Sequence, residues 1–101
     1  IILVGSVAGL IPSEGNFYGA TKWAVTGLAE NTRRHVTRDG IGVTLVAPGV
    51  TVSNFWDGLG GLPDVPSISS EQLAESIVWA IDQPEGVDVN TVTMRPVGMA
   101  S

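Results

Sequence analysis

The stretch I-I-L-V-G-S at residues 1–6 places four apolar residues in a row and ends them with a glycine and a serine. An apolar run without alternation is typical of a strand that is buried on both faces, as in a parallel sheet. Residues 41–47, which read I-G-V-T-L-V-A, predict a second strand that ends at Pro48-Gly49. Residues 87–96 are similarly rich in β-branched side chains and predict a third strand.

A helical pattern separates the first two predicted strands, over residues 17–38. Small and apolar side chains recur there at spacings of three and four residues, and they form one stripe: Ala20, Ala24, Gly27, Leu28 and Asn31. Because these side chains are small, we expect another element to pack very close to this helix. Gly40 stands where a glycine commonly ends a helix.

Residues 50–70 are rich in glycine and proline and are too long for a plain connection, so we expect a functional or mobile loop. Ser69, with Gln72 three residues later, resembles a capping box. The helix that follows, to about Asp82, has one apolar face formed by Leu73, Ile77, Ala80 and Ile81. Strand, helix, strand, helix, strand is the order of an α/β fold with a parallel sheet and right-handed crossovers.

The composition excludes several classes of protein. With 44% hydrophobic and 15% charged residues, the chain is too apolar to be intrinsically disordered. A net charge of −5 disfavours nucleic acid and anionic membranes as partners. No apolar run approaches the roughly 20 residues that span a bilayer, and no basic-then-apolar signal segment is present, so we expect a cytoplasmic protein. The chain has no cysteine and one histidine, and we expect no metal site.

Tyr18 and Lys22 carry the strongest chemical signal. Four residues apart, they lie on the same face of the predicted helix, one turn from each other. A nearby ammonium favours the ionised form of a phenol, which makes such a pair a proton-transfer unit. Ser6 and Pro48-Gly49 follow two of the predicted strands, and active-site residues of parallel sheets lie at the carboxyl ends of the strands. We therefore expect these four features to converge on one rim of the sheet.

Four motifs together resemble one family, the classical short-chain dehydrogenases/reductases. G-S-V-A-G at residues 5–9 is similar to the family's serine segment, and Y-G-A-T-K at residues 18–22 to its tyrosine–lysine motif. G-I-G-V at residues 40–43, with A-P-G at residues 47–49, is similar to the strand and turn at its cofactor site. V-N-T-V-T-M-R-P at residues 89–96 resembles its last core strand. The resemblance extends over nearly the whole chain.

The resemblance implies a catalytic role for three residues. Tyr18 would pass a proton to or from the substrate oxygen. Lys22 would favour the ionised form of Tyr18 and hold the nicotinamide ribose hydroxyls, while Ser6 would hydrogen-bond the substrate oxygen and the phenol. The implied activity is hydride transfer between NAD or NADP and a small-molecule carbonyl/alcohol substrate.

The same resemblance implies a cofactor site beyond Tyr18 and Lys22. Pro48-Gly49 would lie along the nicotinamide, and Thr51 would offer its backbone to the carboxamide. Ser53 stands where the family usually has a threonine near the nicotinamide.

The fold that the resemblance implies is the C-terminal portion of a Rossmann-type doubly wound parallel sheet. No G-x-G-x-x-G turn follows a strand here, and the glycines at residues 58–61 are interpreted as loop flexibility. We therefore expect residues 1–101 to be the C-terminal part of a single NAD(P)-binding domain whose N-terminal nucleotide-binding half is absent. The isolated chain would then be inactive, and the parent protein an enzyme that forms a homodimer or homotetramer.

Several alternatives stay open. The chain could be a truncated, non-catalytic family member that acts as an oligomerisation module, or part of a sugar-nucleotide epimerase of the extended branch. Trp23 could be a core residue or part of a helix–helix subunit contact. Phe55 and Trp56 could line a substrate pocket or simply pin the loop. His35 and the nearby arginines are interpreted as a solvated helix end.

Overall fold

Strand β2 (Thr44–Pro48) is the centre of the fold. In the computed structural model, which describes residues 1–101, it lies between β1 (Ile2–Val4) and β3 (Thr91–Met94) in a parallel sheet of order β1-β2-β3. Val46 and Ala47 are completely buried because β2 is covered on both faces and paired on both edges. The continuous apolar composition that predicted this strand is therefore explained by its central position.

All three strands are shorter than the sequence predicts. β2 begins at Thr44 because the N–H of Val43 donates to the Asp88 carboxylate rather than to a neighbouring strand, at 3.0 Å. Asn90 makes a similar local contact, in which its side-chain amide donates to the Val43 carbonyl. Polar side chains at the start of β3 thus replace ladder hydrogen bonds, and β3 is reduced to Thr91–Met94.

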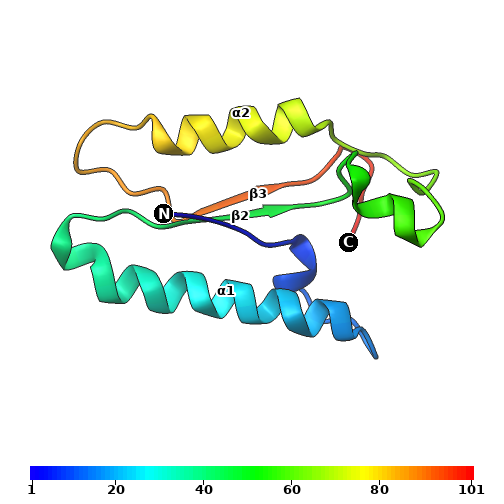
Figure 1. The fold of residues 1–101 in the computed structure, drawn as a ribbon, viewed down its shortest axis with the longest axis horizontal. Coiled ribbons are helices and arrows are strands. Elements are labelled where there is room, and N and C mark those ends of the chain that lie inside the picture. Colours follow the sequence, from blue (N-terminus) through cyan, green and yellow to red (C-terminus); the bar gives the residue numbers. More distant parts are fainter.

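Two long helices cover the sheet, α1 (Phe17–Val36) on one face and α2 (Ser70–Ile81) on the other (Figure 1). The Asn16 side chain accepts from the N–H of Gly19 and starts α1. After α1, a short 3₁₀ turn (Thr37–Asp39) tightens the chain, and Gly40, at φ +76°, ends the helical segment as predicted. α2 begins with the predicted capping box of Ser69 and Gln72.

The two crossovers have opposite hands, so the expectation of right-handed crossovers throughout is wrong. The chain steps in one direction across the sheet, from β1 to β2 to β3, yet α1 and α2 lie on opposite faces. The connection through α1 has the usual right-handed sense, and the connection through α2 is left-handed (Figure 1). The long segment between β2 and α2 carries the chain around to the opposite face.

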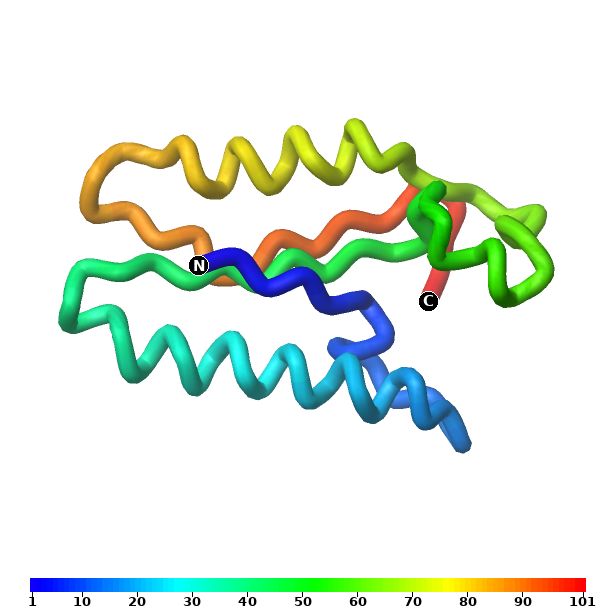
Figure 2. The backbone as a smooth tube through the Cα atoms, in the orientation of Figure 1, coloured from blue at the N-terminus to red at the C-terminus, as the bar shows by residue number.

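Residues 50–70 are more structured than a plain loop. A 3₁₀ helix, η3 (Asn54–Leu59), projects beyond the carboxyl end of β2 and lies near the C-terminus of the chain (Figure 2). Thr51 forms a parallel bridge with Ile68, and the Ser70 hydroxyl donates to the Val52 carbonyl at 2.6 Å. These contacts hold the two ends of the segment together, and this closed part, residues 51–52 with residues 68–70, is called its neck. The tip of the segment projects beyond it.

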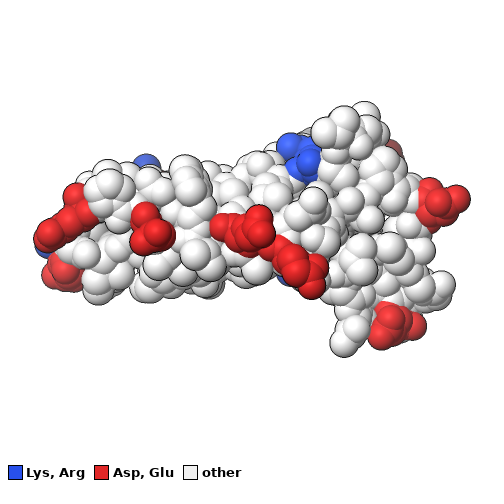
Figure 3. Space-filling view, turned by 90° about the horizontal axis from the view of Figure 1, so that it is seen from above, with Lys and Arg blue, Asp and Glu red and all other residues white.

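The outer faces of the helices are largely uncovered. The stripe of small residues on α1 is exposed, because the close approach to this helix is made elsewhere, by Gly9. Of the apolar face predicted for α2, Ala80 is buried, whereas Ile81 is 64% exposed. Acidic side chains are scattered along the face that α2 presents (Figure 3). Neither long helix combines the length and hydropathy that a membrane-spanning helix needs.

Candidate active site

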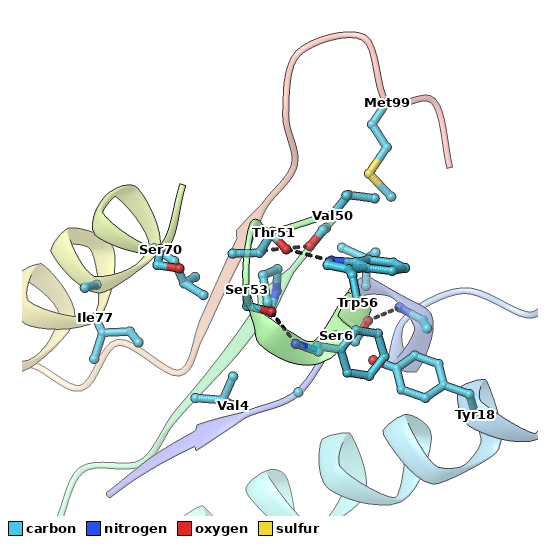
Figure 4. Close-up of a pocket in the computed structure, with 18 residues that line it drawn as sticks. Val4, Ser6, Tyr18, Val50, Thr51, Ser53, Trp56, Ser70, Ile77 and Met99 are labelled. Atoms are coloured by element: carbon cyan, nitrogen blue, oxygen red, sulfur yellow. Dashed lines mark hydrogen bonds between the residues drawn. The ribbon is translucent and has the colours of Figure 1, made fainter. Parts of the chain in front are cut away.

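A cavity of about 500 Å³ lies at the carboxyl ends of the strands (Figure 4). The ends of β1 and β2 supply Ser6 and Pro48-Gly49, and the start of α1 supplies Tyr18. Of the four features predicted to converge on one rim of the sheet, Ser6, Tyr18 and the Pro48-Gly49 turn line this one cavity, and Lys22 does not. Thr51 and Ser53, which the sequence assigns to a cofactor site, also line it.

The geometry of α1 sets Tyr18 and Lys22 one turn apart. The Asn16 cap starts the helix two residues before Tyr18, whose phenol reaches into the cavity from the first turn (Figure 4). The Nζ atom of Lys22 lies 5.4 Å from the centre of the Tyr18 ring. Lys22 itself is not part of the cavity lining.

Ser6 is held by the short 3₁₀ helix η1 (Val7–Gly9), for which it is the N-cap. Its Oγ accepts from the N–H of Ala8 at 3.1 Å, which leaves the hydroxyl proton free to donate into the cavity. η1 in turn packs on α1, because the Thr26 hydroxyl donates to the Gly9 carbonyl at 2.9 Å. The serine and the tyrosine are therefore carried by two elements that are fastened together.

The turn after β2 forms another part of the wall. The N–H of Gly49 donates to the Met94 carbonyl at 2.7 Å and continues the pairing with β3 beyond Pro48. The Thr51 hydroxyl donates back to the Gly49 carbonyl at 3.0 Å. The bridge to Ile68 uses the backbone groups that flank Thr51, and the N–H of Thr51 itself has no protein acceptor.

Phe55 and Trp56, for which the sequence left two roles open, both line the cavity. The indole N–H of Trp56 donates to the Thr51 carbonyl at 2.8 Å, so this residue also pins the loop (Figure 4). Ser53 caps η3, with its Oγ accepting from the N–H of Phe55 at 3.3 Å. The helix η3 therefore both lines the cavity and anchors the loop.

Sequence reasoning missed part of the wall. The additional lining residues come from the turn after β2, from α2 and from the C-terminal segment, and they include Val50, Ser70, Leu73, Ala74, Ile77 and Met99. Leu73 and Ile77 belong to the apolar face predicted for α2, but a helical pattern does not distinguish a cavity wall from a packed core. Met99 has no such pattern, because it comes from an irregular segment after β3.

Other singled-out residues lie outside the cavity. Trp23 is 45% exposed and its indole donates to the Ile11 carbonyl at 3.2 Å, so it is not a core residue within this chain. His35 is exposed, as expected for a solvated helix end. Hydrogen bonds from Arg33 and then Arg34 lower the pKa of the Glu30 carboxyl from 4.5 to about 2, so two of the arginines serve a surface ion pair.

Comparison with known proteins identifies the family. The family model described as short chain dehydrogenase matches residues 1–60, which include the segments that carry Ser6, Tyr18, Lys22 and the Pro48-Gly49 turn. The chain belongs to the short-chain dehydrogenase family. An uncharacterized oxidoreductase of Staphylococcus epidermidis is 34% identical over 98 residues, which cover 96% of this chain. This short-chain dehydrogenase chain spans 42% of the length of that relative.

Solved structures of short-chain dehydrogenases share the fold. The crystal structure of serine dehydrogenase from Escherichia coli superposes on the whole chain with a TM-score of 0.80 and 31% identity, and the chain covers 41% of it. A closed form of serine dehydrogenase complexed with NADP⁺ gives a TM-score of 0.85 and 30% identity, with 45% of that structure covered. A short-chain dehydrogenase from Sphingobium yanoikuyae in complex with NADPH gives 0.80 and 26%, with 38% covered. The three-layer arrangement of this chain is thus the Rossmann-type fold of these enzymes.

Proposed function

We propose that the chain is the catalytic C-terminal part of a nicotinamide-dependent oxidoreductase that interconverts a carbonyl compound and its alcohol. The observation that carries this proposal is the meeting of two hydroxyl side chains, Tyr18 and Ser6, in one cavity at the ends of parallel strands. The ammonium of Lys22 lies 5.4 Å from the centre of the phenol ring, so a positively charged side chain stands next to the hydroxyl-bearing residue.

Each of the three residues has a distinct task. In the reductive direction, the Tyr18 hydroxyl gives a proton to the carbonyl oxygen, and in the oxidative direction the phenolate takes it back. Ser6 donates a hydrogen bond to the same oxygen and stabilises the negative charge that develops there. Lys22, from its position beside Tyr18, holds the ribose hydroxyls of the cofactor.

The turn after β2 fits a nicotinamide. A Cβ on Gly49 would lie 2.7 Å from the Met99 sulfur, so glycine lets the segment after β3 pack closely against this turn. The unpaired N–H of Thr51 suits a carboxamide oxygen, and Pro48 and Ser53 complete the surface beside it. When bound, NAD or NADP supplies or accepts the hydride. Two of the structures named above, with NADP⁺ and with NADPH, are at least 26% identical to this chain and support this choice of cofactor.

We propose that the functional protein is longer than these 101 residues and contains the nucleotide-binding half of the domain. The chain spans 42% of a relative that it matches along almost its whole length. Only 13 of its 101 residues are buried, and large apolar side chains on α2 such as Trp79, 58% exposed, are uncovered. Further chain, or the partner subunits of a homodimer or homotetramer, would cover these surfaces. The alternative function, a non-catalytic oligomerisation module, is disfavoured by the intact Tyr18–Lys22 pair.

The test is the Tyr18→Phe variant of the full-length protein. Removing the hydroxyl deletes the proton carrier, so turnover of carbonyl substrates should fall by a factor of about 10² or more, the usual contribution of a general acid. Affinity for NAD or NADP, measured by fluorescence titration, should change little. Serine is one alcohol to include, because two of the similar structures are serine dehydrogenases. Near-normal turnover by Tyr18→Phe with every substrate would overturn the assignment.

A further inference from the structure

Phe55 is the apolar side chain that lies beside the proton-transferring group. Its ring centre is 5.9 Å from that of Tyr18, with the two planes tilted by 45°. Phe55 lines the cavity and is still 52% exposed, so its ring is available for contact with a further molecule. A substrate whose reacting oxygen meets the Tyr18 hydroxyl would carry its substituents close to this ring.

Trp56 holds the Phe55 ring in this position. The two rings meet edge to face, at 87° and 5.0 Å between centres, an arrangement that aromatic pairs favour. The indole N–H is anchored to the Thr51 carbonyl, and Thr51 is itself fixed by its bridge to Ile68. A chain of contacts therefore runs from the closed neck of the loop through Trp56 to Phe55. These contacts hold the Phe55 ring in place.

The wall that this chain builds around Phe55 is apolar. Hydroxyl groups are grouped near the strand ends, and none of the lining residues carries a charge. The turn after β2, α2 and the C-terminal segment add hydrocarbon and thioether side chains, from Val50, Leu73, Ile77 and Met99, beside the hydroxyls of Thr51, Ser53 and Ser70. A charged substituent placed against this wall would meet no oppositely charged side chain of this chain, and burying it without such a partner costs free energy.

We propose that Phe55 determines specificity and selects carbonyl compounds that bear an uncharged, apolar substituent on the reacting carbon. Trp56 acts through Phe55 as a positioning residue. The proposal rests on the proposed function and names its substrate class. In the reduction, Tyr18 gives its proton to the carbonyl oxygen, while a bound reduced nicotinamide would supply the hydride to the carbonyl carbon and would thereby be oxidised by two electrons.

A matched set of ketones tests this proposal on the full-length protein. 2-Hexanone and 5-oxohexanoate have the same six-carbon chain and differ only in a terminal methyl or carboxylate, while acetone has no substituent long enough to reach Phe55. Wild-type protein should reduce 2-hexanone with a kcat/KM at least about tenfold above that for 5-oxohexanoate. Equal rates for the two ketones, or a preference for the carboxylate, would overturn the proposal.

Variants at Phe55 connect the preference to this side chain. Phe55→Ala should lower kcat/KM for 2-hexanone about tenfold and leave acetone nearly unchanged, because only the longer substituent loses a contact. Phe55→Arg should reverse the preference towards 5-oxohexanoate by giving its carboxylate a partner. Leu59→Ala is the control, since Leu59 lies on the same η3, is 64% exposed and does not line the cavity. Equal losses for acetone and 2-hexanone in Phe55→Ala would count against a specificity role.

Trp56→Phe keeps an aromatic ring but removes the indole donor to Thr51. A positioning role predicts a higher KM for 2-hexanone with kcat for acetone retained, and partial loss of the discrimination against 5-oxohexanoate. Unchanged discrimination in this variant would remove Trp56 from the proposal.

A binding measurement separates this proposal from the proposed function. Saturation-transfer difference NMR reports contact with a ketone whether or not it is reduced. If no ketone turns over with either cofactor, the proposed function fails. Stronger signals for 2-hexanone than for 5-oxohexanoate, lost in Phe55→Ala, would still support the apolar site. Signals of equal strength for both ketones would overturn it.

Discussion

Gly9 packs so closely on Lys22 that a Cβ on the glycine would lie 2.4 Å from the lysine's carbonyl oxygen. The contact is between backbone and backbone, so neither partner can move aside as the end of a flexible side chain could. Together with the hydrogen bond from Thr26 to the Gly9 carbonyl, it fastens η1 to α1. The two elements that carry Ser6 and Tyr18 are thus held at a fixed separation by a glycine that lies outside the cavity.

Gly9→Ala should therefore damage both stability and catalysis. The added methyl group must displace η1 or α1, and such overpacking typically costs about 1–3 kcal/mol. Urea denaturation should show the loss of stability in the full-length protein, and turnover should fall as Ser6 and Tyr18 separate. Gly58→Ala is the matched control, because a Cβ there meets nothing within 4 Å. A Gly9→Ala protein as stable and active as Gly58→Ala would contradict the close contact.

Lys22→Met should affect both cofactor binding and rate. The ammonium stands beside the Tyr18 ring, and in the proposed mechanism it holds the ribose of the cofactor next to the proton-transferring phenol. We expect the KM for NAD or NADP to rise and kcat to fall by about 10² or more, as for loss of a general acid–base unit. Steady-state kinetics with each cofactor measures both effects. Lys22→Arg keeps the charge and should therefore retain more cofactor affinity than Lys22→Met. Equal cofactor affinity in the two variants would exclude a role for the charge.

Local patterns predicted the elements of this fold well and their arrangement less well. The capping box of Ser69 and Gln72 and the terminating Gly40 depend on short-range hydrogen bonding and backbone conformation, and the structure has both. The left-handed crossover could not be predicted, because it depends on which face of the sheet α2 covers. The exposure of Ile81 could not be predicted for a related reason, since a helical pattern shows an apolar face but does not show whether another element covers it.

The candidate site was likewise predictable where it depends on the order of the strands, and not where it depends on tertiary contacts. Ser6, Tyr18 and Pro48-Gly49 lie in one cavity because parallel strands bring their carboxyl ends together, which sequence order alone implies. The contact of Phe55 with Tyr18 joins η3 to the first turn of α1, and no spacing in the sequence encodes it. It is produced by the closed neck of the loop and the anchoring of Trp56, which are tertiary features.

The ion pair of Glu30 should stabilise the folded protein less as the pH becomes acidic. Hydrogen bonds from Arg33 and Arg34 lower its pKa to about 2 in the folded chain. A carboxyl group with a lower pKa in the folded state stabilises the fold above its unfolded pKa, and this contribution disappears as the pH falls from about 4.5 towards 2. Carbon-detected NMR titration of Glu30 should show the low midpoint, and Arg33→Gln should raise it. An unshifted midpoint in the wild type would show that the ion pair does not form in solution.

The 101 residues expressed alone should bind neither NAD nor NADP, if they are the C-terminal part of the domain as proposed. Binding of the pyrophosphate requires a helix N-terminus that follows a glycine-rich turn, and no such turn follows a strand in this chain. β1 pairs only with β2, so one edge of the sheet stays open, and Val4 on that strand is 51% exposed. An open edge beside apolar surface favours aggregation, which light scattering should detect. Isothermal titration with each dinucleotide is the decisive measurement, with the full-length protein as the positive control. Micromolar binding by the isolated chain would show that its nucleotide site is already complete.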